Sequence, residues 1–326
     1  MSIETAAHTI VAIATPAGRG GLGMVRLSGV QAQAIAESLL GRALQPRQAR
    51  VARFCDRDGA LLDQVVAVLF PAPQSATAED VVEITAHGSP VLLQALVAAA
   101  VGAGARPAQP GEFTRRAFLN GKLDLSQAEA VGDLIAAQTL LQARTAAQQL
   151  GGSVARLLAP AHRALVHLIA RLEAGIDFAE DDVAVPDDAP LAAEMARLRE
   201  ELARLQAGVA PPLREGLAVA LVGRPNVGKS SLFNRLLEQA RAIVTAQPGT
   251  TRDLVESSMD WDGIPVRLVD TAGIREPEAE AERLGIEKSW EAAADADVVL
   301  AVLDASAAEG EAERALRQKV AALPRA

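Results

Sequence analysis

The sequence has little of several residue types, and each shortage excludes a class of protein. It holds one cysteine, Cys55, so neither a disulfide framework nor a thiolate metal cluster can form within the chain. It has no tyrosine and only 2% aromatic residues, so its cores must be built from Ala, Leu, Val and Ile. No apolar run reaches the about 20 residues that span a bilayer, and no signal-peptide pattern is recognisable. We therefore expect a cytoplasmic protein without a membrane segment.

Length and charge narrow the classes further. The chain has 326 residues, enough for two or three domains that each bury a core. Its net charge of −9 argues against a protein that coats nucleic acid through a general positive field. The acidic stretch 177–188 lacks ligand-loop spacing, so a solvated linker explains it better than a metal site. Without interleaved Tyr or Trp, a solvated face rather than an RNA platform explains the basic run Arg42, Arg47, Arg50, Arg53 and Arg57.

Three regions differ in their residue patterns. Residues 1–119 carry short β-prone runs and a helix candidate at 90–104, which predicts an α+β domain. Residues 120–212 are helical in pattern, and Pro160 should kink or interrupt the first long helix. Residues 213–326 alternate strand and helix, the pattern of a parallel doubly wound sheet. The β-prone runs of the first region are 8–15, 23–29, 64–70 and 80–88.

The most informative motif is GRPNVGKS at 223–230, which follows an apolar run and precedes a helix-prone stretch. This is the phosphate-binding pattern G-x-x-x-x-G-K-[ST] in the context that it requires. Backbone N–H groups of such a loop cradle phosphate oxygens, which is why Gly223 and Gly228 must lack side chains. We expect Lys229 to reach the β- and γ-phosphates and the Ser230 hydroxyl to ligate Mg²⁺.

Two further motifs follow in the order that a GTPase requires. QPGTTRD (247–253) lies in a polar loop where a threonine can complete the Mg²⁺ shell; Thr251 is the first choice and Thr250 the second. The next strand ends in DTAG, where Asp270 should act on Mg²⁺ through a water and Gly273 lets its N–H approach the γ-phosphate. Together the motifs predict a GTPase of the translation-factor-like class.

One position departs from the common GTPase pattern. Ras-like enzymes carry a Gln directly after the DTAG glycine to orient the attacking water, and here that position is Ile274. Hydrolysis is therefore either very slow or dependent on another polar residue. Arg252 and Arg275 are arginine-finger candidates by location only, and local ion pairs explain them better.

Four blocks, in order, carry a resemblance over essentially the whole chain: HTIVAIATPAGRGGLGMVRLSG (8–29), PGEFTRRAFLNGKLDLSQAEAVGDLI (110–135), EAGIDFAEDD (173–182) and GRPNVGKSSL…PGTTRD…DTAGIRE. They closely resemble the MnmE (also called TrmE) family of tRNA uridine-modification GTPases. Other P-loop GTPases share only the last block. The resemblance implies a folate-binding, dimerising N-terminal domain and a helical domain into which a P-loop GTPase domain is inserted. We expect these three domains at 1–119, 120–212 and 213–326.

The resemblance also implies an activity and partners. Members form homodimers through the N-terminal domain and hydrolyse GTP with Mg²⁺ and K⁺. In a heterotetramer with the FAD-dependent partner MnmG, they add an aminomethyl or carboxymethylaminomethyl group at carbon 5 of the wobble uridine of certain tRNAs. The one-carbon donor is 5-formyl- or methylene-tetrahydrofolate. Arg26, Glu83 and Lys122 match the family's folate contacts, since Arg or Lys suits the tail carboxylates and a carboxylate suits the pterin N–H donors.

Around the phosphates, the resemblance implies further roles. Asn226 matches the family's potassium ligand, and the loop with Thr245, Gln247 and Thr250 would wrap that ion mainly through backbone carbonyls. K⁺ at this place can do the electrostatic work of an arginine finger. Glu282 matches the family's water-orienting glutamate, which makes it catalytic together with Lys229. The implied nucleotide-binding residues are Asn226, Val227, Gly228, Lys229, Ser230, Ser231, Thr245, Ala246, Gln247, Pro248, Gly249, Thr250, Asp270, Thr271, Ala272 and Gly273.

Two family features do not occur in the sequence, which ends at Ala326. They are the guanine-reading N-K-x-D motif and the closing helices with their cysteine-containing signature. We therefore expect a protein of only these residues to bind GTP poorly and not to complete tRNA modification. Two alternatives remain open: a ribosome-assembly GTPase, which shares the P-loop block, and a non-catalytic, dimerising folate-binding module.

Overall fold

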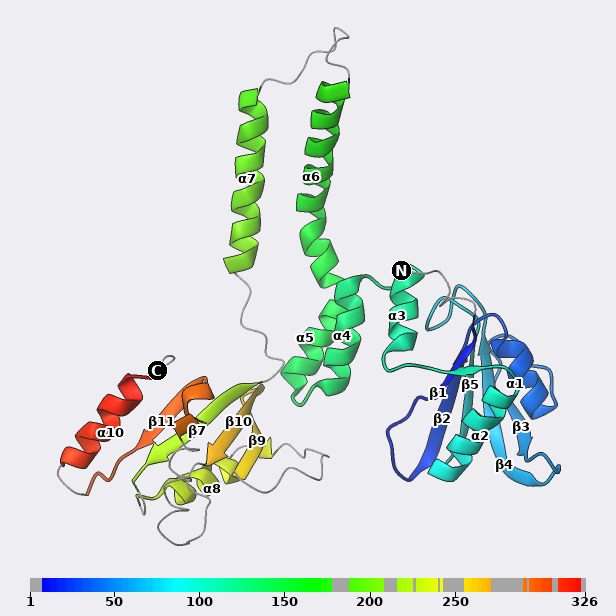
Figure 1. Ribbon diagram of the computed structural model, residues 1–326, viewed down its shortest axis with the longest axis horizontal. Helices are drawn as coiled ribbons and strands as arrows, with labels where there is room; N and C mark the ends of the chain where they lie inside the picture. The colour runs from blue at the N-terminus through cyan, green and yellow to red at the C-terminus, as the bar shows by residue number, and fades with distance from the viewer. Residues whose placement is uncertain are drawn as a thin grey trace. The chain divides into compact units, whose positions relative to one another are not determined.

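The computed structural model divides into two compact units, Met1–Val131 and Gly132–Ala326. Figure 1 shows the elements of each unit. The three domain ranges expected from the sequence are finer than this division and stay a prediction. The residues that the structure describes are 8–177, 188–207, 216–224, 227–239, 241–242, 255–270, 290–291, 293–306 and 310–323.

The first unit is built on a six-stranded sheet of order β3-β4-β5-β2-β1-β6. Neighbouring strands are antiparallel except β1 and β6, which are parallel. The four predicted β-prone runs are confirmed as β1, β2, β4 and β5, whereas β3 and β6 were not predicted. The strands are β1 (Ile10–Ile13), β2 (Gly20–Ser28), β3 (Arg50–Cys55), β4 (Leu61–Phe70), β5 (Val81–Gly88) and β6 (Arg106–Pro107).

Helices cover one face of this sheet, and the other face carries the charged side chains. α1 (Ala32–Leu40) and α2 (Pro90–Gly102) pack on the face that presents Val25 and Leu27, both buried. Because strand side chains alternate, Arg26 and its cross-strand neighbour Glu83 lie on the opposite face. α3 (Glu112–Leu119) meets that second face through Phe113, whose ring contacts Arg26.

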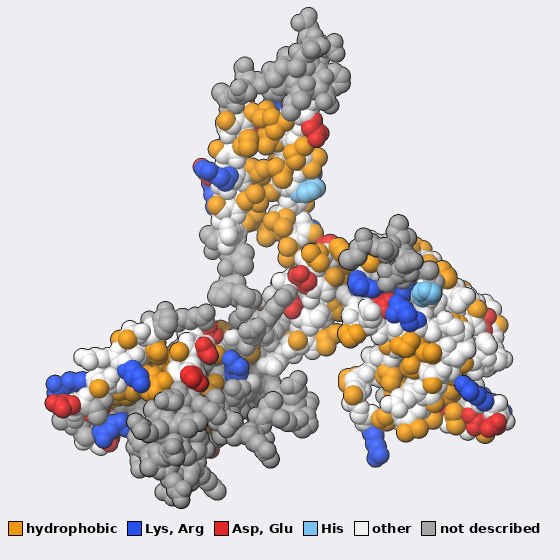
Figure 2. Space-filling model, viewed as in Figure 1, with side chains coloured by type: hydrophobic (Ala, Val, Ile, Leu, Met, Phe, Trp, Pro, Cys, Tyr) orange, Lys and Arg blue, Asp and Glu red, His pale blue; other side chains and the backbone are white. Residues whose placement is uncertain are grey.

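The helical part begins with α4 (Leu125–Ala136) and α5 (Leu140–Leu150). α6 (Ser153–Asp177) and α7 (Asp188–Ala207) then pack against each other, and Figure 2 shows apolar side chains along both. Pro160 lies inside α6 without interrupting it, so that expectation was wrong. Proline removes one backbone hydrogen bond and strains one turn, and the turns on either side keep their own bonds.

The second unit contains a five-stranded sheet of order β11-β7-β10-β9-β8. β7, β10 and β11 are parallel, as predicted, but β9 and β8 are antiparallel. The cause is a tight turn at Asp262 and Gly263, whose φ values of 51° and 89° suit the turn of a hairpin. Its elements are β7 (Leu217–Gly223), β8 (Arg241–Ala242), β9 (Val255–Trp261), β10 (Ile264–Asp270), β11 (Val298–Val302), α8 (Lys229–Gln239) and α10 (Glu311–Ala321).

The N-terminus of α5 fastens the hairpin tip to the helical part of the same unit. The Thr139 hydroxyl accepts from the Gln142 amide at 3.2 Å, which caps the helix, and donates to the Gly263 carbonyl oxygen at 2.7 Å. A Cβ on Gly263 would lie 3.1 Å from the Cβ of Leu141, so the turn and the helix are in close contact.

Candidate functional site

The phosphate loop follows a strand that is buried on both faces. β7 lies between β10 and β11 and runs parallel to both. One face of β7 packs against Phe233 and Met259, and the other packs against Ala293. In open sheets of parallel strands, ligands bind in the crevice beyond the carboxyl ends of the strands. The loop therefore starts at the edge of the sheet where a nucleotide site belongs.

The lysine of the motif is held by the loop itself. Its side chain is buried, and Nζ donates to the carbonyl oxygens of Gly223 at 2.8 Å and Arg224 at 2.7 Å. A Cβ on Gly223 would lie 2.6 Å from the carbonyl oxygen of Val302 and 3.3 Å from Cδ of Lys229. Gly228 has a φ of +99°, which glycine adopts without strain. The geometry explains why both positions are glycine.

The remaining described residues of the motif lie at a helix N-terminus. α8 begins at Lys229, so Ser230 and Ser231 lie in its first turn, where backbone N–H groups attract an anion. Asp270 ends β10, and its backbone pairs with Leu221, two residues before the loop. This is the position predicted for the Mg²⁺-linked aspartate, although its side chain is outside the described residues. Within the described residues, no three His, Cys, Asp or Glu side chains cluster as metal ligands do.

Sequence reasoning missed one contact of this loop. Arg224 Nη1 donates to Glu313 Oε1 at 2.8 Å, and Glu313 Oε2 accepts from the Gly310 amide at 2.9 Å. The hydrogen bond from Arg224 lowers the pKa of Glu313 below its usual value. The acidic residue three positions after Gly310 could have predicted the start of α10. Nothing in the sequence signals its pairing with a loop 89 residues away.

The rest of the predicted nucleotide site lies outside the described residues. Its members keep the roles that the sequence predicts for them, and the same is true of Ile274, Arg252 and Arg275. The site residues concerned are Asn226, Thr245, Ala246, Gln247, Pro248, Gly249, Thr250, Thr251, Thr271, Ala272, Gly273 and Glu282.

In the first unit, two of the three predicted folate residues touch. Arg26 donates to Glu83 Oε1 from Nε at 3.0 Å and from Nη2 at 2.7 Å. The guanidinium carbon of Arg26 lies 5.7 Å from the centre of the Phe113 ring, a neighbour that sequence reasoning missed. Lys122 instead donates to the Ser75 carbonyl oxygen, and no described contact joins it to either partner.

A buried network of charges surrounds α3. Glu112 is fully buried and accepts from Arg106 Nη2 at 2.6 Å, Arg116 Nη2 at 3.1 Å and the Gln109 amide at 2.8 Å. Arg116 Nη1 also donates to Glu79 Oε2 at 3.0 Å. Burial raises the pKa of Glu112, but the hydrogen bonds from Arg106, the Gln109 amide and Arg116 outweigh it and lower the pKa to about 2.

Glu79 links this network to the strand that carries Arg26. Ser28 Oγ donates to Glu79 Oε2 at 2.7 Å, and Ser28 lies two residues after Arg26 on the same face of β2. Beyond the end of α3, Asn120 Nδ2 donates to the Thr77 carbonyl oxygen at 2.7 Å. Side chains of α3 and of the residue after it therefore hold the segment before β5 and the end of β2 together.

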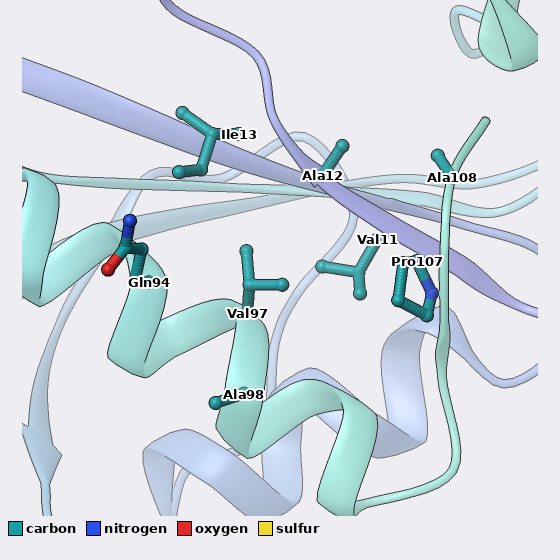
Figure 3. Close-up of a pocket in the computed structure, with 8 residues that line it drawn as sticks. All are labelled: Val11, Ala12, Ile13, Gln94, Val97, Ala98, Pro107 and Ala108. Carbon is teal, nitrogen blue, oxygen red and sulfur yellow. The ribbon is translucent and has the colours of Figure 1, made fainter. Parts of the chain in front are cut away.

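A hollow of about 370 Å³ lies away from all of these residues, between β1, β6 and α2 (Figure 3). Gln94 is its one polar lining side chain. Folate carboxylates and nucleotide phosphates need charged or N–H donors, which this hollow does not offer. We therefore place neither ligand there. Its lining residues are Val11, Ala12, Ile13, Gln94, Val97, Ala98, Pro107 and Ala108.

Comparison with known proteins matches both regions. Residues 9–122 match the family model described as GTP-binding protein TrmE N-terminus, and residues 218–324 match that described as 50S ribosome-binding GTPase. A solved structure of the G domain of the T. maritima FeoB iron transporter is 29% identical. It covers 33% of this chain and 65% of that one, with a TM-score of 0.24.

Full-length relatives decide the family. A protein of Koribacter versatilis (strain Ellin345) named tRNA modification GTPase MnmE is 59% identical over 310 residues, which cover 93% of this chain and 68% of that protein. The chain belongs to the MnmE family. Its relative of the same name from Azoarcus sp. (strain BH72) is 49% identical over 317 residues, 97% of this chain and 70% of that protein. Across such MnmE relatives the chain spans between 64% and 70% of their length.

Membership in the MnmE family confirms the resemblance seen in the sequence and identifies a GTP-hydrolysing enzyme. The ribosome-assembly alternative accounts for the match at 218–324 but not for the match at 9–122. None of the helices in the described ranges is long and apolar enough to cross a membrane.

Proposed function

We propose that this chain is the part of an MnmE enzyme that couples GTP hydrolysis to modification of the wobble uridine of tRNA. The proposal includes a homodimer formed through the first unit and a tetrahydrofolate one-carbon donor bound there. It also includes an FAD-dependent partner, MnmG, with which an aminomethyl or carboxymethylaminomethyl group is added at carbon 5. One observation supports it most: a phosphate loop with a buried lysine and a half-buried Arg–Glu pair occur in one chain that matches MnmE relatives throughout.

The nucleotide chemistry follows from the loop. Lys229 already points its ammonium group at loop carbonyls, and phosphate oxygens would compete with these carbonyls for its protons. Ser230 starts a helix and is suited to hold Mg²⁺, with Thr251 completing the shell and Asp270 acting through a water. Glu282 would orient the attacking water. Bound Mg²⁺ and K⁺ supply positive charge where negative charge develops between the phosphates.

Potassium is assigned by kinship with the family. Asn226, Thr245, Gln247 and Thr250 would provide its oxygen ligands, mostly from the backbone. The negative net charge of the chain and the weak case for Arg252 and Arg275 both leave room for a cation in this role.

The test combines calorimetry with a hydrolysis assay on the full chain. We expect 5-formyltetrahydrofolate and GTP to bind at independent sites, and GTP turnover to be faster in KCl than in NaCl. Binding of the folate alone would support a folate-binding module without catalysis. Binding of GTP with no affinity for the folate would contradict the proposed one-carbon chemistry.

A further inference from the structure

The pairing of Arg26 with Glu83 limits what the two residues can do separately. Both nitrogens of the Arg26 fork donate to the same oxygen, Glu83 Oε1. Their side chains are 28% and 21% exposed, so ligand can reach them from one side. Among the described residues, none donates to Glu83 Oε2. The pair therefore offers a carboxylate with one oxygen oriented by arginine and one oxygen open to a ligand.

The shape of folate makes this pairing informative. Its pterin ring lies at one end and its glutamate carboxylates at the other, separated by a p-aminobenzoyl group. Two side chains joined by hydrogen bonds of 2.7 and 3.0 Å occupy one place on such a molecule. Arg26 therefore cannot serve the tail while Glu83 serves the pterin.

Charge decides which end of the ligand meets the pair. A tail carboxylate next to Glu83 would face a like charge, which disfavours binding. The pterin instead presents adjacent N–H donors, which match the oxygens of a carboxylate. The pair consequently fits the ring end of folate.

Phe113 supplies a second, independent indication. The whole chain has only six Phe and two Trp, yet one of these rings lies against Arg26. A flat aromatic surface next to a hydrogen-bonding pair suits a fused heteroaromatic ring, through stacking, and offers nothing to a carboxylate. The position of Phe113 is fixed from below, because its neighbour Glu112 is anchored in the buried network of α3.

Lys122 is the matching candidate for the other end of the ligand. It is exposed, it follows α3, and its ammonium donates only to the Ser75 carbonyl oxygen among described partners. Segment 75–79 is itself tied to α3 and to β2 through Arg116 and Ser28. The ammonium is therefore held near the Arg26 face but does not belong to the Arg26–Glu83 pair.

We propose that Arg26, Glu83 and Phe113 form the subsite for the pterin ring of folate. Glu83 accepts the pterin N–H groups, Phe113 covers the ring, and Arg26 is a positioning residue that orients Glu83. Lys122 binds the tail carboxylates. This inference rests on the proposed folate binding and assigns each residue to one end of the ligand.

Two ligands separate the ends: 5-formyltetrahydrofolate and its tailless analogue 5-formyltetrahydropteroate, each titrated calorimetrically into the full chain. We expect Arg26→Ala and Phe113→Leu to weaken both ligands, each by roughly 10-fold, the loss of one good polar or stacking contact. Lys122→Gln should weaken only the ligand that has the tail. Phe118→Leu is the matched control, because Phe118 lies on the same helix and is not in contact with Arg26.

Arg26→Lys separates orientation from simple charge. Lysine can bind a tail carboxylate but cannot reproduce the two-nitrogen fork on Glu83. We expect this variant to remain weak for both ligands. Recovery of normal affinity by Arg26→Lys, or an Arg26→Ala loss confined to the tailed ligand, would overturn the inference while leaving folate binding intact. Failure of the unaltered chain to bind either ligand would overturn the folate function and the inference with it.

Discussion

In the first unit the candidate ligand residues come from separate segments of the chain, whereas in the second unit the described contacts of the phosphate loop are largely local. Arg26 and Glu83 are 57 residues apart, and their meeting depends on the register of two strands. Lys229 reaches its two carbonyl partners across only six and five residues. One site is assembled by tertiary packing, and the other is a short stretch of chain presented by a buried strand.

The difference has an energetic side. The folate face depends on a fully buried carboxylate, Glu112, and on the arginines that neutralise it. Buried ion pairs contribute little net stability, but removing one partner leaves an unpaired charge at high cost. The phosphate loop depends on the apolar burial of β7, which is insensitive to charge. The two regions should therefore fail for different reasons.

The largest expected effect is that of Glu112→Ala. It would leave the buried Arg116 and the half-buried Arg106 without their shared carboxylate, at a cost of about 3 to 5 kcal/mol in the free energy of unfolding. Urea unfolding followed by circular dichroism would measure this loss, and hydrogen exchange would locate it in the first unit.

The matched control is Glu238→Ala, which removes an exposed surface pair with Arg235 and should cost about 0.5 kcal/mol or less. Equal stability of the Glu112→Ala and Glu238→Ala variants would show that the network around α3 is dispensable. The contrast between the two regions would then lose its energetic basis.

The same carboxylate predicts a pH dependence. The pKa of Glu112 is about 2 in the folded chain and 4.5 ordinarily, so the unfolded state binds the proton first as the pH falls. The stabilisation from Glu112 is complete above about pH 4.5 and is lost progressively as the pH falls toward 2. Stability measured between pH 6 and pH 2.5 should fall less steeply in Glu112→Gln than in the unaltered chain. Identical slopes would contradict the assignment.

A change within the phosphate loop should act locally. Lys229→Ala removes the charged donor to the β- and γ-phosphates, so we expect roughly a 100-fold loss of GTP affinity, with folate binding unchanged. Titration of both ligands would measure this. Lys319→Ala serves as the control, since that lysine lies over the Trp290 ring and outside the loop. A parallel loss of folate affinity would show that the two regions are coupled.

The smallest effect is expected where α5 meets the hairpin of the second sheet. Thr139→Val removes both the helix cap and the donor to Gly263, which should cost about 1 kcal/mol. Thr139→Ser should restore most of it. Thr145→Val, on the same helix but bonded only to the preceding turn, is the control and should change thermal stability less.

Local patterns in the sequence predicted the strand, loop and helix around Lys229 and the four long strands of the first sheet. They did so because alternation and the glycine-rich motif act within a few residues. Long-range neighbours escaped prediction: Phe113 against Arg26, Glu313 against Arg224, and the antiparallel strand β9. Each depends on how distant segments pack, and a single sequence carries no signal of that packing. The Asp262–Gly263 pair was the exception, since it signals a hairpin that we did not draw from it.

Cys55 closes β3 in the first unit and is half-buried, while both tryptophans, Trp261 and Trp290, belong to the second unit. The molecule thus carries its own pair of spectroscopic reporters. Thiol reactivity follows the folate-side unit, and indole emission follows the nucleotide-side unit. Since the chain has no other thiol, any disulfide that Cys55 forms within this protein must join two molecules through their first units.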